Sequence, residues 1–197
     1  MIPGGGERQL QKELSKIRAD HVARYVLAAK TVHGNVIDAA CGCGYGSFII
    51  ARDCKDLHHV TGFDIDAPSI DFANQNWKHE RNTFAVQDLA AFQVTGKFDY
   101  IVSFETIEHI LDPAPFLIAA SKITDRLLCS VPNEEKLPFE KRRFPYHHRH
   151  YTTKEITALL EDCGFAVEKV RYQNNAYSTD FDVRPGRTTI IEAKAKV

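Results

Sequence analysis

Hydrophobic positions along the chain follow two different spacings. Short apolar runs predict buried strands at residues 35–40, 58–64, 83–87, 100–104 and 126–131. Helical material lies between them, for example at residues 47–54, and Asp66 with Pro68 marks a further helix start. Because buried strand and helix alternate five times, the pattern predicts an α/β fold with a doubly wound, mostly parallel sheet.

The two ends of the chain extend this pattern. Apolar residues at near-helical spacing predict one N-terminal helix over residues 7–32, ended by Gly34. Thr152 and Glu155 have the spacing of a capping box for a helix that stops at Gly164. Residues 165–172 and 187–196 alternate as strands, and the turn-rich link between them predicts an antiparallel pair at one edge of a seven-stranded sheet. We expect residues 1–197 to form a single domain.

Composition excludes several classes of protein. Hydrophobic residues make up 44 % and charged residues 26 % of the 197 residues, the balance of a soluble globular protein. The net charge of -1 predicts no general attraction to nucleic acid or membrane, and no apolar run is long enough for a membrane span. The N-terminus lacks a signal-peptide core, so we expect a cytoplasmic protein. Five cysteines without a CxxC pair favour reduced, buried thiols over a zinc site or a disulfide framework.

The clearest chemical signal is "VIDAACGCGYGSF" at residues 36–48, where Asp38 precedes Gly42, Gly44 and Gly46. Ligands of doubly wound sheets bind at the carboxyl ends of strands, and glycine there permits positive φ and close backbone approach. The dinucleotide fingerprint needs its third glycine where Ser47 stands, and a P-loop needs a lysine that is absent. An acid before the turn suits a cationic or amine-bearing ligand; the alternative is a tight turn without a ligand.

This stretch resembles motif I of the class I S-adenosylmethionine-dependent methyltransferases, and the resemblance continues in order along most of the chain. "VTGFDID" resembles the family's ribose-binding segment, "FAVQDL" its adenine-binding segment, "FDYIVSFETIEHI" its fourth motif and "LLEDCGFAVEKV" its last helix and sixth strand. The resemblance implies a methyltransferase whose Asp64 holds both ribose hydroxyls. Ala40 departs from the family pattern, because many members have glycine there.

The resemblance also implies a set of cofactor contacts. Arg24 and Tyr25, in the leading helix, correspond to residues that approach the methionine end of the cofactor in many small members, and Asp88 and Leu89 to residues that contact the adenine edge. The implied S-adenosylmethionine contacts are Arg24, Tyr25, Asp38, Ala40, Gly42, Gly44, Tyr45, Gly46, Asp64, Ile65, Asp88, Leu89 and Glu105.

Acidic residues and histidines predict the catalytic side. Glu105, Glu108 and His109 are spaced to share one face of a helical turn directly after the fourth strand, where they could bind a divalent cation, Mg or Mn rather than zinc. Ubiquinone-pathway O-methyltransferases and small-RNA 3′-terminal 2′-O-methyltransferases carry a similar E-x-x-E-H, and "FPYHHRHYTTKEI" resembles a segment that makes His147 the candidate fourth ligand. Without metal, His109 or His147 could act as a general base. The acids could also simply cap a helix.

Residues 133–152 contain the one basic, aromatic-rich stretch, "KLPFEKRRFPYHHRH". The hypothesis is a lid over the acceptor, with Lys141, Arg142, Arg143 and Arg149 available for phosphate or carboxylate; the alternative is a solvated loop. Near-neutral charge favours a small-molecule or saccharide-type acceptor, possibly phosphate-bearing, over nucleic acid. We therefore expect O-methylation. The alternatives are N-methylation, RNA 2′-O-methylation and a catalytically silent cofactor-binding module.

Overall fold

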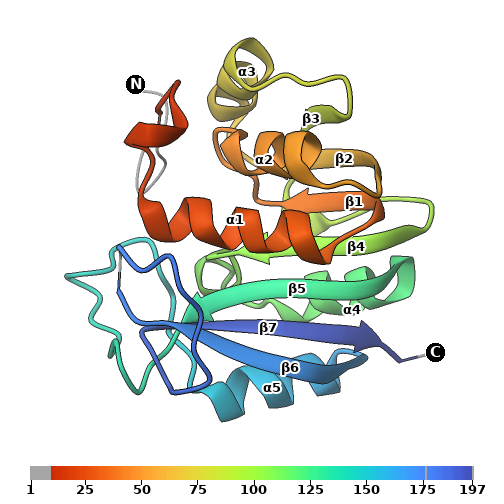
Figure 1. Cartoon of the computed structure of the whole chain (residues 1–197). Coiled ribbons are helices and arrows are strands. Elements are labelled where there is room, and N and C mark those ends of the chain that lie inside the picture. The colour runs from red at the N-terminus through yellow and green to blue at the C-terminus, as the bar shows by residue number, and fades with distance from the viewer. Residues whose placement is uncertain (1–9, 176, 197) are drawn as a thin grey trace.

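The computed structural model describes residues 10–175 and 177–196. Seven strands form one sheet in the order β3-β2-β1-β4-β5-β7-β6 (Figure 1). Their bounds are Gly34–Ala39 (β1), Leu57–Asp64 (β2), Asn82–Val86 (β3), Phe98–Phe104 (β4), Thr124–Pro132 (β5), Phe165–Gln173 (β6) and Thr188–Ala195 (β7). β7 runs antiparallel to both β5 and β6, and the other strand pairs are parallel. The predicted mostly parallel sheet with an antiparallel pair at one edge is confirmed.

Helices cover both faces of this sheet and create two hydrophobic cores. The helices are Ala19–Thr31 (α1), Tyr45–Asp53 (α2), Ala67–Asn76 (α3), Ala114–Ile123 (α4) and Thr153–Asp162 (α5). α1, α2 and α3 contribute to one core, which includes Ile49 and Ile70, whereas α4 and α5 contribute to the other, which includes Leu117 and Ile156. Two covered faces explain why the strands read as continuous apolar runs.

Two helices begin at the capping residues predicted from the sequence. The Asp66 side chain accepts a hydrogen bond from the Ser69 backbone N–H at the start of α3. Thr152 and Glu155 form the reciprocal capping box of α5.

The prediction of buried thiols is also confirmed, because all five cysteines are free and buried.

The prediction of one N-terminal helix over residues 7–32 is wrong. Residues 7–9 lie outside the described residues; after them come a short 3-10 turn at Leu14–Lys16 and an extended Ile17, before α1 begins at Ala19. The break lets Ile17 bury its side chain in the core, while the Arg18 guanidinium donates two hydrogen bonds to Asp20 and so holds the new helix start. α1 ends at Thr31, and Gly34, with φ of +67°, opens β1 instead of ending the helix.

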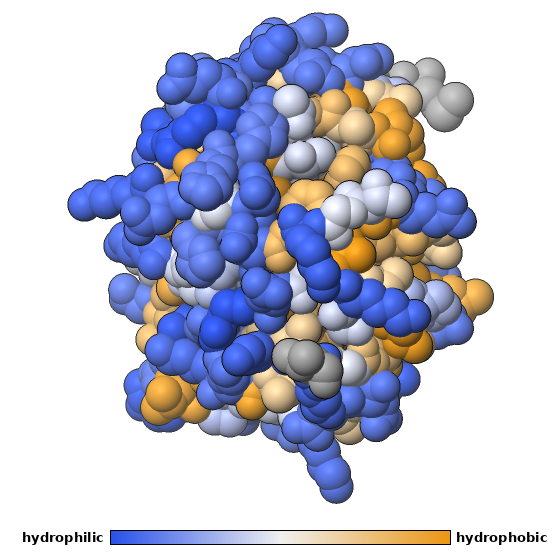
Figure 2. Space-filling model, turned by 90° about the vertical axis from the view of Figure 1, so that its right-hand side faces the viewer, coloured by the Kyte–Doolittle hydropathy of each residue, from blue (hydrophilic) through white to orange (hydrophobic). Residues whose placement is uncertain are grey.

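The two ends of the sheet differ in character. Figure 2 views the side at which β7 ends and β5 begins, and hydrophilic residues cover much of it, with hydrophobic residues between them toward the right of the view. The opposite end carries the loops that follow the parallel strands, including the glycine turn. Among the described helices, none has both the length and the apolar character that crossing a membrane requires.

Candidate active site

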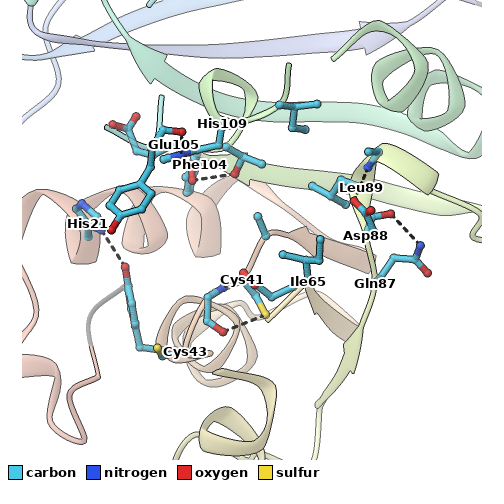
Figure 3. A pocket seen from close by; sticks show the side chains of 18 of the residues that line it. His21, Cys41, Cys43, Ile65, Gln87, Asp88, Leu89, Phe104, Glu105 and His109 are labelled. Atoms are coloured by element: carbon cyan, nitrogen blue, oxygen red, sulfur yellow. Dashed lines mark hydrogen bonds between the residues drawn. The ribbon is translucent and has the colours of Figure 1, made fainter. Parts of the chain in front are cut away.

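A cavity of about 490 Å³ opens at the carboxyl ends of β1 and β4. These two neighbouring strands mark the point where the strand order reverses, which is where open α/β sheets bind ligands. In Figure 3, His21, Phe104, Glu105 and His109 lie toward one end of the cavity and Gln87, Asp88 and Leu89 toward the other. The predicted site residues that line it are Arg24, Tyr25, Ala40, Gly42, Tyr45, Asp64, Ile65, Asp88, Leu89, Glu105 and His109.

Glycine occupies the three positions of the turn for different structural reasons. A Cβ at Gly42, whose φ is +55°, would meet no atom within 4 Å, so this backbone borders open space. At Gly44, with φ of +88°, a Cβ would lie 2.5 Å from the Cβ of Ala73. At Gly46 it would collide with the Tyr25 ring. Gly42 therefore faces the cavity, whereas Gly44 and Gly46 permit packing behind it.

Asp38 lies beneath the turn and is not among the residues that line the cavity. Its fully buried carboxylate accepts hydrogen bonds from the Tyr25 hydroxyl (3.1 Å) and the Ser47 hydroxyl (2.6 Å). Burial raises the pKa of Asp38 to about 6, although both hydrogen bonds favour the charged form. Asp38 thus joins β1 to α1 and α2, and acts on the site through Tyr25 and the turn.

Two residues that line the cavity have left-handed backbones although they are not glycine. Ala40 has φ of +62°, which gives a physical reason for a glycine preference at this position. Glu105 has φ of +50° and is held by Ser130 of β5, whose carbonyl and hydroxyl accept from the Glu105 N–H and whose hydroxyl donates to Oε1 (2.8 Å). Such strain persists only where surrounding structure enforces it, and it clusters at functional sites.

Helix α1 contributes one positively charged side chain to the cavity lining. Arg24 is almost fully buried and lines the cavity, and its Nη1 donates to Gln173 Oε1 at 2.6 Å. Asp20 lies 3.5 Å from the same Nη1, but its carboxylate also accepts from Arg18. The Asp20 carboxylate is therefore shared between Arg18 and Arg24. The Arg24 guanidinium favours an anionic ligand group in the cavity.

His21 also lines the cavity, and the sequence analysis missed it. Its Nδ1 lies 2.9 Å from the Tyr45 hydroxyl. Burial, followed by the nearby Arg24 and Arg18 charges, lowers the pKa of His21 well below its ordinary value. The signal that could have found it is the spacing to Arg24 and Tyr25, which puts all three on one helix face.

Asp64 and Asp88 end β2 and follow β3. Asp64 accepts hydrogen bonds from the backbone N–H groups of Gly42 and Asp66, both at 2.9 Å. Asp88 caps a short 3-10 helix by accepting from the Ala90 N–H. Both carboxylates border the cavity, and the 60 % exposed Ile65 lies beside them as an apolar contact surface.

The predicted helical turn of Glu105, Glu108 and His109 does not form, which corrects the sequence analysis. Only Ile107–His109 are helical, in a 3-10 turn, because Glu105 is left-handed and Thr106 is non-helical. The residues brought together are instead Glu108, His109 and His147, whose ligand atoms all lie within 4.8 Å of one another. Glu108 and His147 are buried and do not line the cavity, whereas His109 does.

Basic residues of the segment 133–152 make contacts within the fold. Arg149 forms an ion pair with Glu155 (2.8 Å), and the Lys141 Nζ donates to the His147 carbonyl (2.9 Å). Tyr146 is the residue of this segment that lines the cavity. An anion-binding role for these basic side chains therefore gains no support from the cavity lining.

The fold and the cavity define a class: a Rossmann-like domain with a glycine turn and an acid at the end of β2, as in class I S-adenosylmethionine-dependent methyltransferases. A family model described as "Methyltransferase domain" matches residues 30–176, and the chain belongs to this family. The protein is accordingly a methyltransferase that uses S-adenosylmethionine.

Relatives support the same assignment. A protein of Mycolicibacterium smegmatis named "Probable S-adenosylmethionine-dependent methyltransferase" is 30 % identical, over 99 % of this chain and 77 % of its own length. A similarly named protein of Mycobacterium tuberculosis is 28 % identical over 90 % of this chain, and the matched part spans 65 % of that relative's length. The fold alone is shared with an S-adenosylmethionine-dependent methyltransferase structure from Mesorhizobium loti, which superposes with a TM-score of 0.72 at 16 % identity, covering 92 % of this chain and all of that chain.

The glycine geometry predicts that Gly44→Ala mainly lowers the stability of the fold, whereas Gly42→Ala mainly weakens ligand binding. Gly44→Ala should lower the free energy of unfolding by about 3 kcal/mol, because positive φ and a clash add together. Gly42→Ala should cost only about 1 kcal/mol, yet weaken S-adenosylhomocysteine binding at least tenfold, because its methyl enters the cavity. Urea denaturation measures the stability of each variant, and calorimetry measures its affinity for S-adenosylhomocysteine. If both variants were equally destabilised and kept their affinity, the different roles of Gly42 and Gly44 would be contradicted.

The buried Asp38 predicts a pH-dependent stability. Its pKa in the folded protein, about 6, exceeds the ordinary value of 3.8. The contribution of protonated Asp38 to the free energy of unfolding is therefore fully present below pH 3.8 and is lost as pH rises through 6. The free energy of unfolding of the wild type, measured relative to that of Asp38→Asn, should therefore fall by on the order of 3 kcal/mol between pH 3.5 and pH 7. Urea denaturation at both pH values measures it; a constant difference would show that Asp38 titrates normally.

Proposed function

We propose that this methyltransferase methylates a hydroxyl of a small-molecule or saccharide-type acceptor beside His109. The observation that carries the proposal is the cluster of Glu108, His109 and His147, because its ligand atoms converge and His109 lines the cavity. A neutral hydroxyl is a weak nucleophile and needs help to lose its proton during transfer, whereas a neutral amine is nucleophilic enough to attack before it loses a proton. A cluster of this kind therefore favours O-methylation over N-methylation. We also propose that the chain forms one domain, in which residues 133–152 cover the acceptor.

The residues of the cavity fit S-adenosylmethionine from end to end. Arg24 suits the cofactor carboxylate, Asp64 suits the ribose hydroxyls, and Asp88 with Ile65 and Leu89 suits the adenine. The open space at Gly42 lets backbone approach the ligand closely. When bound, the cofactor supplies an electrophilic methyl group on a sulfonium, and the chain contributes its orientation relative to the acceptor.

Beside His109, three further residues add an apolar surface to the cavity. Ile110, Leu111 and Tyr146 line it, and Leu111 and Tyr146 are 80 % and 54 % exposed. Exposed apolar side chains at a cavity mouth are typical of ligand-binding surfaces. We infer that the non-reacting part of the acceptor rests on this surface, either as an apolar body or as the C–H face of a sugar ring.

Glu108, His109 and His147 also fit a divalent cation. Two imidazoles and one carboxylate are a set that leaves coordination positions open, and the paired imidazoles favour Mn²⁺ over Mg²⁺. Glu105 is not part of the set, because Ser130 holds its carboxylate. A cation held there supplies positive charge that lowers the pKa of an acceptor hydroxyl. We propose these three residues as its ligands.

Chelation tests this proposal. Chelator treatment should lower methyl transfer to a hydroxyl acceptor at least 100-fold, and added Mn²⁺ should restore it. Glu108→Gln should reproduce the loss without changing the affinity for S-adenosylhomocysteine, because Glu108 does not line the cavity. A panel of hydroxyl and amine acceptors provides the substrates.

Replacement of His109 distinguishes the metal from a general base. His109→Gln should abolish the Mn²⁺ response, whereas His148→Gln, at an exposed neighbouring position, should behave as wild type. Activity that resists chelator but disappears in His109→Gln would identify His109 as a general base instead. Transfer only to amine acceptors would overturn O-methylation.

A further inference from the structure

One buried amide connects the cavity lining to a distant part of the sequence. Gln173 is the last residue of β6, is 1 % exposed and does not line the cavity. Its Oε1 accepts from Arg24 Nη1 at 2.6 Å, and its Nε2 donates to the backbone carbonyl oxygens of Asp20 (3.1 Å) and Ser178 (3.0 Å). These bonds join α1, which begins at the left of Figure 1, to the loop that follows β6.

The orientation of this amide follows from its partners. Backbone carbonyl oxygens can only accept, so the two hydrogens on Gln173 Nε2 must face Asp20 and Ser178. Oε1 is then the atom that faces Arg24, whose guanidinium can only donate. An amide turned the other way would set donor against donor at Arg24 and acceptor against acceptor at both carbonyls. Gln173 therefore has one orientation that satisfies all three partners, and this orientation holds Arg24 Nη1.

Gln173 holds Arg24 without cancelling its charge, because an amide is neutral. The Asp20 carboxylate lies farther away, 3.5 Å from Arg24 Nη1, and accepts two shorter bonds from Arg18, at 3.1 and 2.7 Å. The charges of Arg18, Asp20 and Arg24 sum to one positive charge. The lowered pKa of His21 agrees with this sum: burial is the main cause, and the charges of Arg24 and Arg18 add to it. This part of the cavity lining is therefore suited to an anionic group.

Arg24 also has donor capacity that the fold does not use. Its side chain is almost fully buried, and it lines the cavity. Among the residues that the structure describes, none accepts a hydrogen bond from Arg24 Nε. A buried donor of a charged group is costly without an acceptor, so Arg24 favours a ligand that brings an anionic acceptor. Because the guanidinium is planar, a bond that holds Nη1 also restricts its other nitrogens before any ligand binds.

We propose that Gln173 is a positioning residue for S-adenosylmethionine binding: it holds the Arg24 guanidinium in place and, being neutral, leaves the charge of Arg24 for the cofactor carboxylate. The contact between Arg24 and that carboxylate rests on the proposed function. The anchoring of Arg24 does not, because it follows from the hydrogen bonds of the amide. A glutamate at position 173 would also bond the guanidinium, but its charge would compete with the carboxylate of the ligand.

Two ligands test this role by calorimetry: S-adenosylhomocysteine and its decarboxylated analogue, which lacks only the carboxylate. Gln173→Met should weaken S-adenosylhomocysteine binding about tenfold, and Gln173→Glu about 100-fold, because a competing charge is added. Affinity for the decarboxylated analogue should stay within threefold of wild type, which shows that each variant is folded. Gln93→Glu makes the same charge change at an exposed position and should leave both affinities within twofold. An equal loss for both ligands, or wild-type affinities in Gln173→Glu, would refute the positioning role.

Arg24→Met separates a failure of this role from a failure of the proposed function. It should abolish the preference for the ligand that carries the carboxylate, and adding Gln173→Met to it should then change the ratio of the two affinities less than twofold. If Arg24→Met leaves the ratio unchanged, the contact between Arg24 and the carboxylate is wrong, and the role of Gln173 toward the carboxylate fails with it. If Arg24→Met lowers the ratio and the Gln173 variants do not, only the positioning role fails.

The anchoring of Arg24 is measured in the ligand-free wild type, so it does not depend on the folding of a variant. The ¹⁵N NMR signals of the Arg24 guanidinium, assigned from its backbone resonances, should show two separate Nη nitrogens. The bond from Nη1 to Gln173 slows rotation of the guanidinium and keeps the two nitrogens distinct. One averaged Nη signal in the ligand-free protein would overturn the anchoring, and with it the proposal.

Discussion

The hydrogen-bonded carboxylate of the buried Asp38 is the contact on which the candidate active site depends. It sits in β1, an interior strand of the sheet, and accepts hydrogen bonds from Tyr25 of α1 and Ser47 of α2. Through Tyr25 it fixes the helix that carries His21 and Arg24 to the cavity, and through Ser47 it fixes the helix that follows the glycine turn. A carboxylate in such a place is costly to ionise. The cavity wall is therefore held by an interaction that never needs to touch the ligand.

Sequence reasoning succeeded where one local rule decided the outcome. The apolar runs identified the strands, and the caps of α3 and α5 followed from side chains within the first turn. The glycine turn was located correctly, but Gly44 and Gly46 could not be told apart from Gly42. Their need for glycine comes from Ala73 and Tyr25, which are distant in sequence and meet the turn only in the folded chain.

The cluster of Glu108, His109 and His147 was predicted less well, because spacing alone assumed a regular helical turn. The left-handed backbone of Glu105 and its bond to Ser130 on the neighbouring strand remove that residue from the cluster. Neither feature is visible in "ETIEHI". His147 reaches Glu108 and His109 from a loop without regular structure, and this was expected only through family resemblance. His21 was missed although helical spacing puts it on the same face as Arg24.

The reversed direction of β7 affects how the protein is completed during synthesis. Because β7 runs against its neighbours, the link from β6 to β7 returns to the cavity end of the sheet, beside the segment 133–152 at the left of Figure 1. At that end Gln173 bonds Arg24, 149 positions earlier in the chain, and Asn133 bonds the Gly186 carbonyl. Contacts between such distant positions form late in folding. A nascent chain on the ribosome can therefore build β1 to β4 early, but the cavity is closed only after the last strands emerge.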